Sequence, residues 1–108
     1  MKRILSLALT LIAFNAYTQV YVPNAFTPDN DGRNDVFKAY TADTLDRFNL
    51  QIFNKDGDMV FETDDINQGW MGGVYYYAPV DIYTYKLMYR KRNNRGTEII
   101  YGTVKLLR

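Results

Sequence analysis

Hydrophobic and polar residues alternate along several short stretches of this chain. In residues 48–52, three apolar side chains are separated by Asn49 and Gln51. Residues 81–90 repeat the pattern, and one of their two faces is formed by Tyr83, Tyr85, Leu87 and Tyr89. A period of two is typical of a β-strand with one buried face, whereas no stretch after residue 19 has helical periodicity. The pattern therefore predicts an all-β protein.

Turn-forming residues separate these stretches. The pair Asp56-Gly57 predicts a tight hairpin, because both residues tolerate the positive φ that such turns need. We expect strands at residues 20–22, 36–40, 48–52, 59–63, 74–77, 81–90 and 97–107. Six or seven short strands with regularly spaced turns predict a single antiparallel β-sandwich, immunoglobulin-like, with about seven strands.

The first residues have the layout of a secretory signal peptide. Met1-Lys2-Arg3 is positive, residues 4–14 are apolar except for two hydroxyl side chains, and residues 15–19 are polar. The apolar run is short for a membrane-spanning helix, which needs roughly 20 residues, although a membrane anchor or a buried helix is the alternative interpretation. We expect residues 1–18 to be a cleaved signal peptide, with cleavage after Ala16 as the near alternative. Residues 19–108 are then the mature domain, in which we expect no transmembrane segment.

Composition excludes several kinds of function. The chain has 13 Lys and Arg, 12 Asp and Glu, no His and no Cys. Without Lys2 and Arg3, the expected mature chain has a net side-chain charge of −1, which argues against nucleic acid as a partner. The expected mature chain also lacks Ser, because Ser6 lies in the signal peptide. Nucleophilic catalysis with Ser or Cys and His, and zinc sites built from Cys and His, are excluded. We therefore expect no enzyme activity and no cofactor.

An acidic loop at residues 27–38 is the one place where a metal site can be argued. Asp29, Asp31 and Asp35 alternate around a glycine, as carboxylates do in a calcium loop. The position that should supply a bidentate Glu is Lys38, however, and calcium usually needs six or more oxygen ligands. The other interpretation, which we favour, is a loop held by Asx-turns without metal.

Three further features allow both a structural and a functional interpretation. The basic cluster at residues 90–95 is expected to be a solvated hairpin tip, or alternatively a contact for an acidic partner. The tyrosines at residues 75–77 belong either to the core or to an interface. We expect Trp70 to fill the core, with its indole N–H donating to a loop carbonyl, rather than to anchor a ligand.

The order of several motifs resembles one protein family. Residues 22–37 read Val-Pro-Asn-Ala-Phe-Thr-Pro-Asp-Asn-Asp-Gly-Arg-Asn-Asp-Val-Phe. Leu-Gln-Ile-Phe-Asn follows at residues 50–54, Val-Phe-Glu-Thr at 60–63, Gly-Trp-Met-Gly at 69–72 and Gly-Thr-Val-Lys-Leu-Leu-Arg at 102–108. On these residues the chain resembles the gliding-motility-associated, type B sorting domain of the type IX secretion system of Bacteroidota. It departs from the family at Asp56, where an aromatic is common, and at Met71, where an acidic residue or Asn is common.

The resemblance implies a domain that the type IX outer-membrane machinery recognises. Because this domain follows the expected signal peptide at once, we expect an accessory or resident subunit bound to the outer-membrane translocon barrel or its shuttle barrel. The alternative is a small exported cell-surface or adhesion module that is only cargo of the pathway. In either case we expect export across the inner membrane and a location at the outer membrane or cell surface.

We expect partner binding to use the loop after residue 23 and the C-terminal strand, with docking that includes strand addition along an open sheet edge. The predicted partner-binding residues are Asn24, Phe26, Thr27, Asp29, Asp31, Asn34, Asp35, Lys105, Leu106, Leu107 and Arg108.

Overall fold

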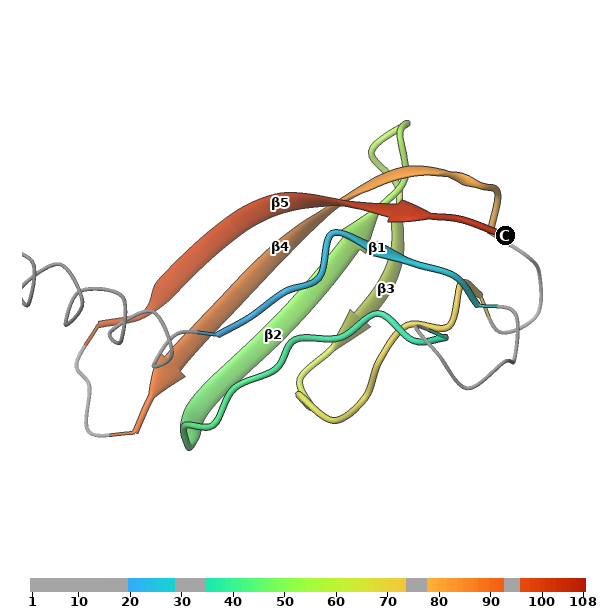
Figure 1. Cartoon of the computed structure of the whole chain (residues 1–108). Coiled ribbons are helices and arrows are strands. Elements are labelled where there is room, and N and C mark those ends of the chain that lie inside the picture. The colour runs from blue at the N-terminus through green and yellow to red at the C-terminus, as the bar shows by residue number, and fades with distance from the viewer. Residues whose placement is uncertain (1–19, 29–34, 74–77, 93–95) are drawn as a thin grey trace, which may run out of the picture.

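One β-sheet organises the described part of the chain. The computed structural model describes residues 20–28, 35–73, 78–92 and 96–108. The strands, shown in Figure 1, are β1 (Ala25–Phe26), β2 (Leu45–Phe53), β3 (Met59–Thr63), β4 (Asp81–Lys91) and β5 (Glu98–Leu106). Their order across the sheet is β1-β5-β4-β2-β3. Within these residues the fold is all-β, as predicted.

Three antiparallel pairings form most of this sheet. β4 pairs with β5 from Asp81↔Leu106 to Tyr89↔Glu98, and β2 pairs with both β4 and β3. The predicted hairpin joins β2 to β3, where Gly57 has a φ of 87°. The Oδ1 atom of Asn54 accepts hydrogen bonds from the N–H groups of Asp56 and Asp58, both at 2.9 Å. The turn prediction is therefore confirmed.

Side chains alternate between the two faces of the sheet as the sequence predicted. On β4, the four residues Tyr83, Tyr85, Leu87 and Tyr89 are buried. The residues between them are exposed or half-buried. On β2, Leu50 and Ile52 are fully buried on the same side. Burial of each such apolar side chain contributes roughly 1.5–3 kcal/mol, so this face is the main source of stability.

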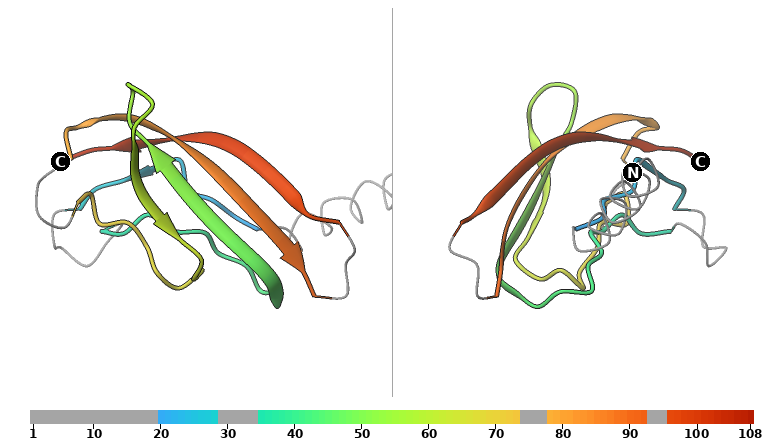
Figure 2. Two further views of the ribbon diagram at one scale, coloured as in Figure 1. Left: turned by 180° about the vertical axis from the view of Figure 1, so that it is seen from behind. Right: turned by 60° about the vertical axis from the view of Figure 1, so that its left-hand side comes forward.

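A second layer covers the buried face, and it consists of irregular segments. Figures 1 and 2 show residues 20–24, 35–44 and 64–73 on one side of the sheet. Single antiparallel bridges join these segments, one at Tyr21↔Tyr40 and one at Phe37↔Trp70. The predicted immunoglobulin-like antiparallel sandwich with about seven strands is therefore not confirmed. The described residues form one sheet of five strands, which is mixed because β1 runs parallel to β5.

Two of the predicted strands are reduced to isolated bridges. Residues 20–22 pair only at Tyr21, and the next residue, Pro23, has no N–H with which to continue a ladder. Residues 36–40 use two different partners, one for Phe37 and one for Tyr40, so no continuous ladder forms. The strand predicted at residues 74–77 lies outside the described residues.

Aromatic rings connect the two layers. The Trp70 ring lies 4.9 Å from the Tyr83 ring in an edge-on arrangement and 5.4 Å from the Phe26 ring. Phe37 lies 5.9 Å from Phe26 and 5.7 Å from Tyr85. Such pairs add about 0.5–1.5 kcal/mol beyond the area they bury. Trp70 therefore fills the core as predicted, but the predicted hydrogen bond from its N–H to a loop carbonyl is not found among the described residues. In the described part of the chain, its buried Nε1 atom has no hydrogen-bond partner.

Two glycines allow close packing that a larger residue would prevent. A Cβ atom at Gly69 would overlap Cγ1 of Val36 and lie 3.0 Å from the carbonyl oxygen of Phe37. A Cβ atom at Gly102 would lie 2.5 Å from Cζ of Tyr85, because the ring of Tyr85 packs directly over the glycine. Gly69 thus lets the Phe37–Trp70 bridge form, and Gly102 makes room for a ring of the core.

Candidate partner-binding surface

The two segments predicted to bind a partner lie side by side at one end of the sheet. β1 pairs in parallel with the end of β5, through Ala25↔Lys105 and Phe26↔Leu106. The N–H of Lys105 donates to the carbonyl of Asn24 at 2.9 Å, and the N–H of Leu107 donates to that of Phe26 at 2.9 Å. Residues 80 positions apart in the sequence therefore share one surface, near the C-terminus in Figure 1.

Arg108 holds this end of the molecule together. Its guanidinium group donates to the carbonyl of Ala78 at 2.9 Å and to that of Pro28 at 3.4 Å. Gly72 lies beneath it with a φ of 82°, and a Cβ atom there would come within 3.4 Å of the guanidinium group. The side chain of Arg108 thus links the N-terminal loop to the chain leading into β4.

The predicted site residues divide into buried and exposed groups. Phe26 and Leu106 are buried in the core, so their side chains support the surface without forming it. Asn24, Lys105, Leu107 and Arg108 are exposed, whereas Thr27 and Asp35 are half-buried. Asp29, Asp31 and Asn34 lie outside the described residues. We call the exposed residues Asn24, Lys105, Leu107 and Arg108 the C-terminal surface.

Exposed apolar side chains that were not predicted from the sequence form an interrupted strip on the outer face of the sheet. The strip lies on the face of β4 and β5 that the second layer leaves uncovered in Figure 2. We call Val80, Ile82, Ile99 and Tyr101, which are 49–72% exposed, the outer strip, although the pair Thr84↔Thr103 separates Ile82 from Ile99 and Tyr101 along the strands. Residues 98–107 are apolar on both faces, and a strand with that pattern is usually covered on both sides. This was the signal that could have identified the strip.

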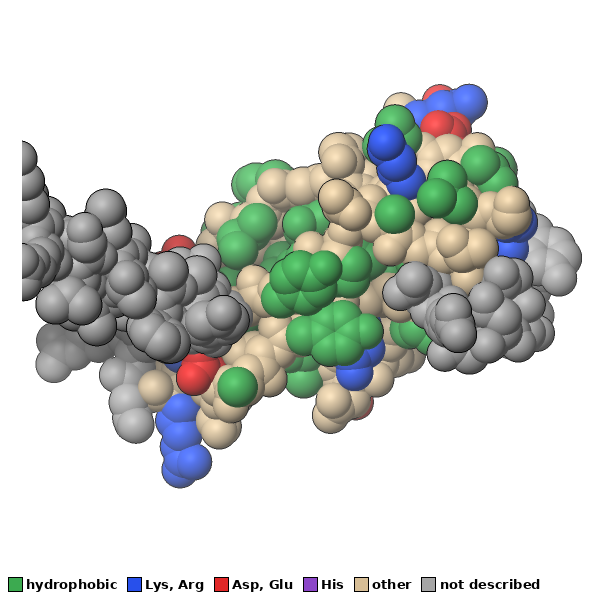
Figure 3. Space-filling view, in the orientation of Figure 1, with side chains coloured by type: hydrophobic (Ala, Val, Ile, Leu, Met, Phe, Trp, Pro, Cys, Tyr) green, Lys and Arg blue, Asp and Glu red, His purple; other side chains and the backbone are tan. Residues whose placement is uncertain are grey.

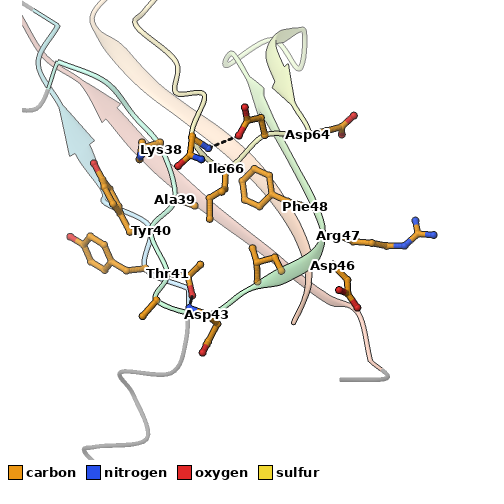
Figure 4. A pocket seen from close by; sticks show the side chains of 15 residues that line it. Lys38, Ala39, Tyr40, Thr41, Asp43, Asp46, Arg47, Phe48, Asp64 and Ile66 are labelled. Atoms are coloured by element: carbon orange, nitrogen blue, oxygen red, sulfur yellow. Dashed lines mark hydrogen bonds between the residues drawn. The ribbon is translucent and has the colours of Figure 1, made fainter. Parts of the chain in front are cut away.

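A groove lies at the opposite end of the second layer. It has a volume of ≈ 910 Å³ and runs between the start of β2 and residues 38–43 and 64–67. In Figure 4, Phe48 and Ile66 point into it, whereas Arg47 points away. Tyr21 and Tyr40 line one wall with their rings 6.2 Å apart, and the Lys38 ammonium lies 5.1 Å from the centre of the Tyr40 ring. Figure 3 shows the molecule from the side of the second layer, and hydrophobic side chains gather in the middle of this view.

Ion pairs border this groove. Lys91 lies 3.2 Å from Asp43, and Arg90 lies 3.8 Å from Asp46. Two charges of the basic cluster predicted at residues 90–95 are therefore paired within the molecule, whereas residues 93–95 lie outside the described part. The groove is lined by aromatic, apolar and charged side chains, a combination that suits binding.

The chemistry of the described residues offers few other sites. They contain no group of three or more acidic, His or Cys side chains that could hold a metal ion. Because the centre of the acidic loop lies outside the described residues, the calcium question stays a prediction. Burial raises the pKa of the Tyr85 hydroxyl above its ordinary value of 10.0. No helix in the described part of the chain is long and apolar enough to span a membrane.

Comparison with known proteins identifies the family. Residues 20–103 match the family model described as the CHU_C type IX secretion signal domain. This family is a secretion signal domain and not a catalytic one, and it implies a secreted protein. No curated protein and no solved structure matches the chain. The match covers most of the chain and includes β1 to β4 and the part of β5 up to Thr103. The chain therefore belongs to the type IX secretion signal domain family.

Proposed function

We propose that the type IX secretion machinery binds this chain at the C-terminal surface and exports it. The observation that carries the proposal is the pairing of β1 with the end of β5, which joins two sequence-distant segments that resemble family motifs into one surface. The second segment lies beyond residues 20–103, which the family model matches. Arg108 reinforces that surface through Ala78 and Pro28. A receptor can therefore recognise the folded domain as one shape, and the same motifs on an unfolded chain would be apart.

In this proposal the chain is cargo of the pathway, delivered to the outer membrane or the cell surface. The family description supports cargo directly, since a secretion signal marks a protein for export. The resident-subunit hypothesis, placed first on sequence grounds, comes second because the family match adds nothing to it. The outer-membrane translocon and its shuttle barrel are the proposed partners under both hypotheses.

Export of variants that each introduce a negative charge tests the proposed surface. We would express the full chain with an internal tag at residues 93–94, in a type IX-competent bacterium and in a strain lacking the translocon. Lys105→Glu and Leu107→Asp change exposed side chains of the C-terminal surface and are expected to reduce surface and medium levels at least tenfold. The matched control is Arg92→Glu, an exposed residue at the opposite end of the sheet, which should be exported normally.

The result distinguishes cargo from resident subunit. Solubilising outer membranes in mild detergent and purifying the tagged chain should recover it mostly without stoichiometric barrel proteins if it is cargo. Stoichiometric recovery with the translocon barrel would support the resident subunit instead. Export that is unchanged in the translocon-deficient strain, or equal for all three variants, would contradict the proposal.

A further inference from the structure

β5 has an open edge next to the C-terminal surface. On one side, β5 pairs with β4 along its whole length, from Glu98 to Leu106. On the other side, the only strand among the described residues is β1, and it pairs with Lys105 and Leu106 alone. The chain before β1 leaves the edge, because Tyr21 hydrogen-bonds to Tyr40 in the second layer. In the sheet that the described residues form, most of β5 therefore lies at an edge.

The direction of the free backbone groups follows from the bonds to β1. Lys105 and Leu107 donate their N–H groups toward β1, to Asn24 and Phe26 respectively. The N–H and C=O groups of successive strand residues point to opposite neighbours within the sheet. The groups of every second residue of β5 therefore point to the β1 side, as those of Lys105 do. Ile99, Tyr101 and Thr103 thus present their N–H and C=O groups to the open edge. In the described structure these groups meet no neighbouring strand.

The side chains beside this edge indicate what kind of strand it would accept. Ile99 is 50% exposed and Tyr101 is 72% exposed, and both lie on the uncovered face. Lys86 lies opposite Tyr101 and Lys105 lies opposite Ile82 on this face. The residues of β4 and β5 that face this way include no carboxylate; they are Ile82, Thr84, Lys86, Met88, Arg90, Ile99, Tyr101, Thr103 and Lys105.

We infer that the open edge of β5 at Ile99–Thr103 accepts an extended segment of a partner protein as an added strand. The segment continues the line of β1 along β5, bonding to the backbone groups of Ile99, Tyr101 and Thr103. On the uncovered face it carries apolar side chains that cover Ile99 and Tyr101, and at least one carboxylate within reach of Lys86 or Lys105. An exposed apolar edge favours aggregation, which occupation by a partner prevents.

This inference rests on the proposed function, because it names the contact by which the export machinery holds the C-terminal end of the sheet. It extends that surface from Lys105 toward Glu98 and adds backbone recognition to side-chain recognition. Main-chain bonds contribute affinity largely independent of sequence, and the outer strip supplies selectivity.

Site-specific photocrosslinking in cells tests the added strand. A benzoylphenylalanine residue placed in turn at Ile99, Tyr101 and Thr103 of the full chain would report its neighbours during export. In an added strand, side chains on one face repeat every second residue. The three probes should therefore label one partner segment at positions two residues apart, in steadily rising or steadily falling order.

Proline variants separate backbone bonding from side-chain contact. Proline is tolerated in an edge strand where the N–H faces outward, so Thr103→Pro should fold and keep its pairing with β4. It removes one N–H from the open edge and should reduce crosslinking from Tyr101 at least tenfold. The matched control, Thr103→Ala, shortens the side chain but keeps the N–H and should crosslink as the parent does. If Thr103→Pro lowers the melting temperature by more than a few degrees, Ile99→Pro replaces it.

The crosslinking results either support or overturn the added strand. Ordered crosslinks on one partner segment that Thr103→Pro removes would support the added strand. Scattered crosslinks, no crosslinks, or equal crosslinking by the proline variant would overturn it. Crosslinks to a second copy of this chain, or to its own residues, would overturn a partner protein as the occupant. Export measured in the same cells is independent: loss of translocon dependence would contradict the proposed function, whereas normal export without ordered crosslinks would contradict only the added strand.

Discussion

Replacing Gly102 by alanine tests how closely the Tyr85 ring is packed between the sheet and the second layer. The two residues lie opposite each other in the β4–β5 register. A Cβ atom at position 102 would lie 2.5 Å from Cζ and 2.8 Å from Cε2 of Tyr85, far inside van der Waals contact. The ring cannot move freely away, because it is 9% exposed and lies 5.7 Å from the Phe37 ring.

The expected loss of stability follows from two opposing effects. Overpacking a well-packed core costs about 1–3 kcal/mol. Removing a glycine reduces the entropy of the unfolded chain and stabilises by roughly 0.4–1 kcal/mol. Gly102→Ala should therefore lower the free energy of unfolding by about 1.3 kcal/mol, the difference between the midpoints of these two ranges. For a domain of this size, each kcal/mol corresponds to roughly 4–8 °C in melting temperature.

Urea unfolding followed by tryptophan fluorescence measures this loss. Trp70 is the only tryptophan and is buried in the core, so its emission reports tertiary unfolding. The matched control is Gly96→Ala, where a Cβ atom would meet nothing within 4 Å and the stability should change by less than about 0.5 kcal/mol. In a Tyr85→Leu background, Gly102→Ala should cost much less than in the parent. Equal or greater stability of Gly102→Ala, or the same cost in both backgrounds, would refute the packing argument.

Three other predictions follow from the same structure. Gly69→Ala should destabilise the domain by about 2 kcal/mol or more, because its Cβ atom overlaps Val36; chemical denaturation would measure it, and a neutral result would contradict the close approach. Burial raises the pKa of Tyr85 in the folded state, so the stability that the neutral hydroxyl contributes is fully present below pH 10.0. That stability is lost as the pH rises through the folded-state pKa, because the unfolded state then releases the proton more easily than the folded state. Unfolding measured between about pH 9 and 12 should show a shallower alkaline loss for Tyr85→Phe than for the parent; parallel curves would contradict this. Millimolar calcium should leave the melting temperature unchanged if the loop at residues 27–38 is held by Asx-turns, whereas an increase would establish a metal site, since a ligand that binds only the native state must stabilise it.

The buried face of the sheet was predictable because its signals are local. Alternation along β4 placed four apolar residues on one face, and all four are buried. The bounds of β3 agree with the prediction at residues 59–63, because Gly57 ends the preceding turn and a polar stretch follows Thr63. Trp70 was expected in the core and is found there. The alternation on β4 and the bounds of β3 depend on residues within one turn or one strand, so neighbouring sequence suffices for them, whereas Trp70 packs on the distant residues Phe26 and Tyr83.

The candidate surface was only partly predictable. The family motifs identified the segments around Asn24 and Lys105, but not that Phe26 and Leu106 are buried between them. The list of partner-binding residues predicted within these motifs did not separate supporting residues from exposed ones. Nor did it anticipate that Arg108 bonds to Ala78 and Pro28 of its own chain. Burial depends on which segments meet in space, and a motif carries no information about that.

The order of hydrophobic and polar residues is enough to show that this chain forms strands and which side of β2 and β4 is buried, because side chains alternate between the two faces of a strand. Its motifs also identify the family, which residues 20–103 confirm. Only the tertiary structure shows that β1 joins the sheet in parallel and that two expected strands meet their neighbours at single bridges. The same holds for the open edge at Ile99–Thr103. Strand pairing depends on competition among distant segments for the same backbone groups, and here the backbone of Tyr21 pairs with Tyr40 in the second layer and not with β5.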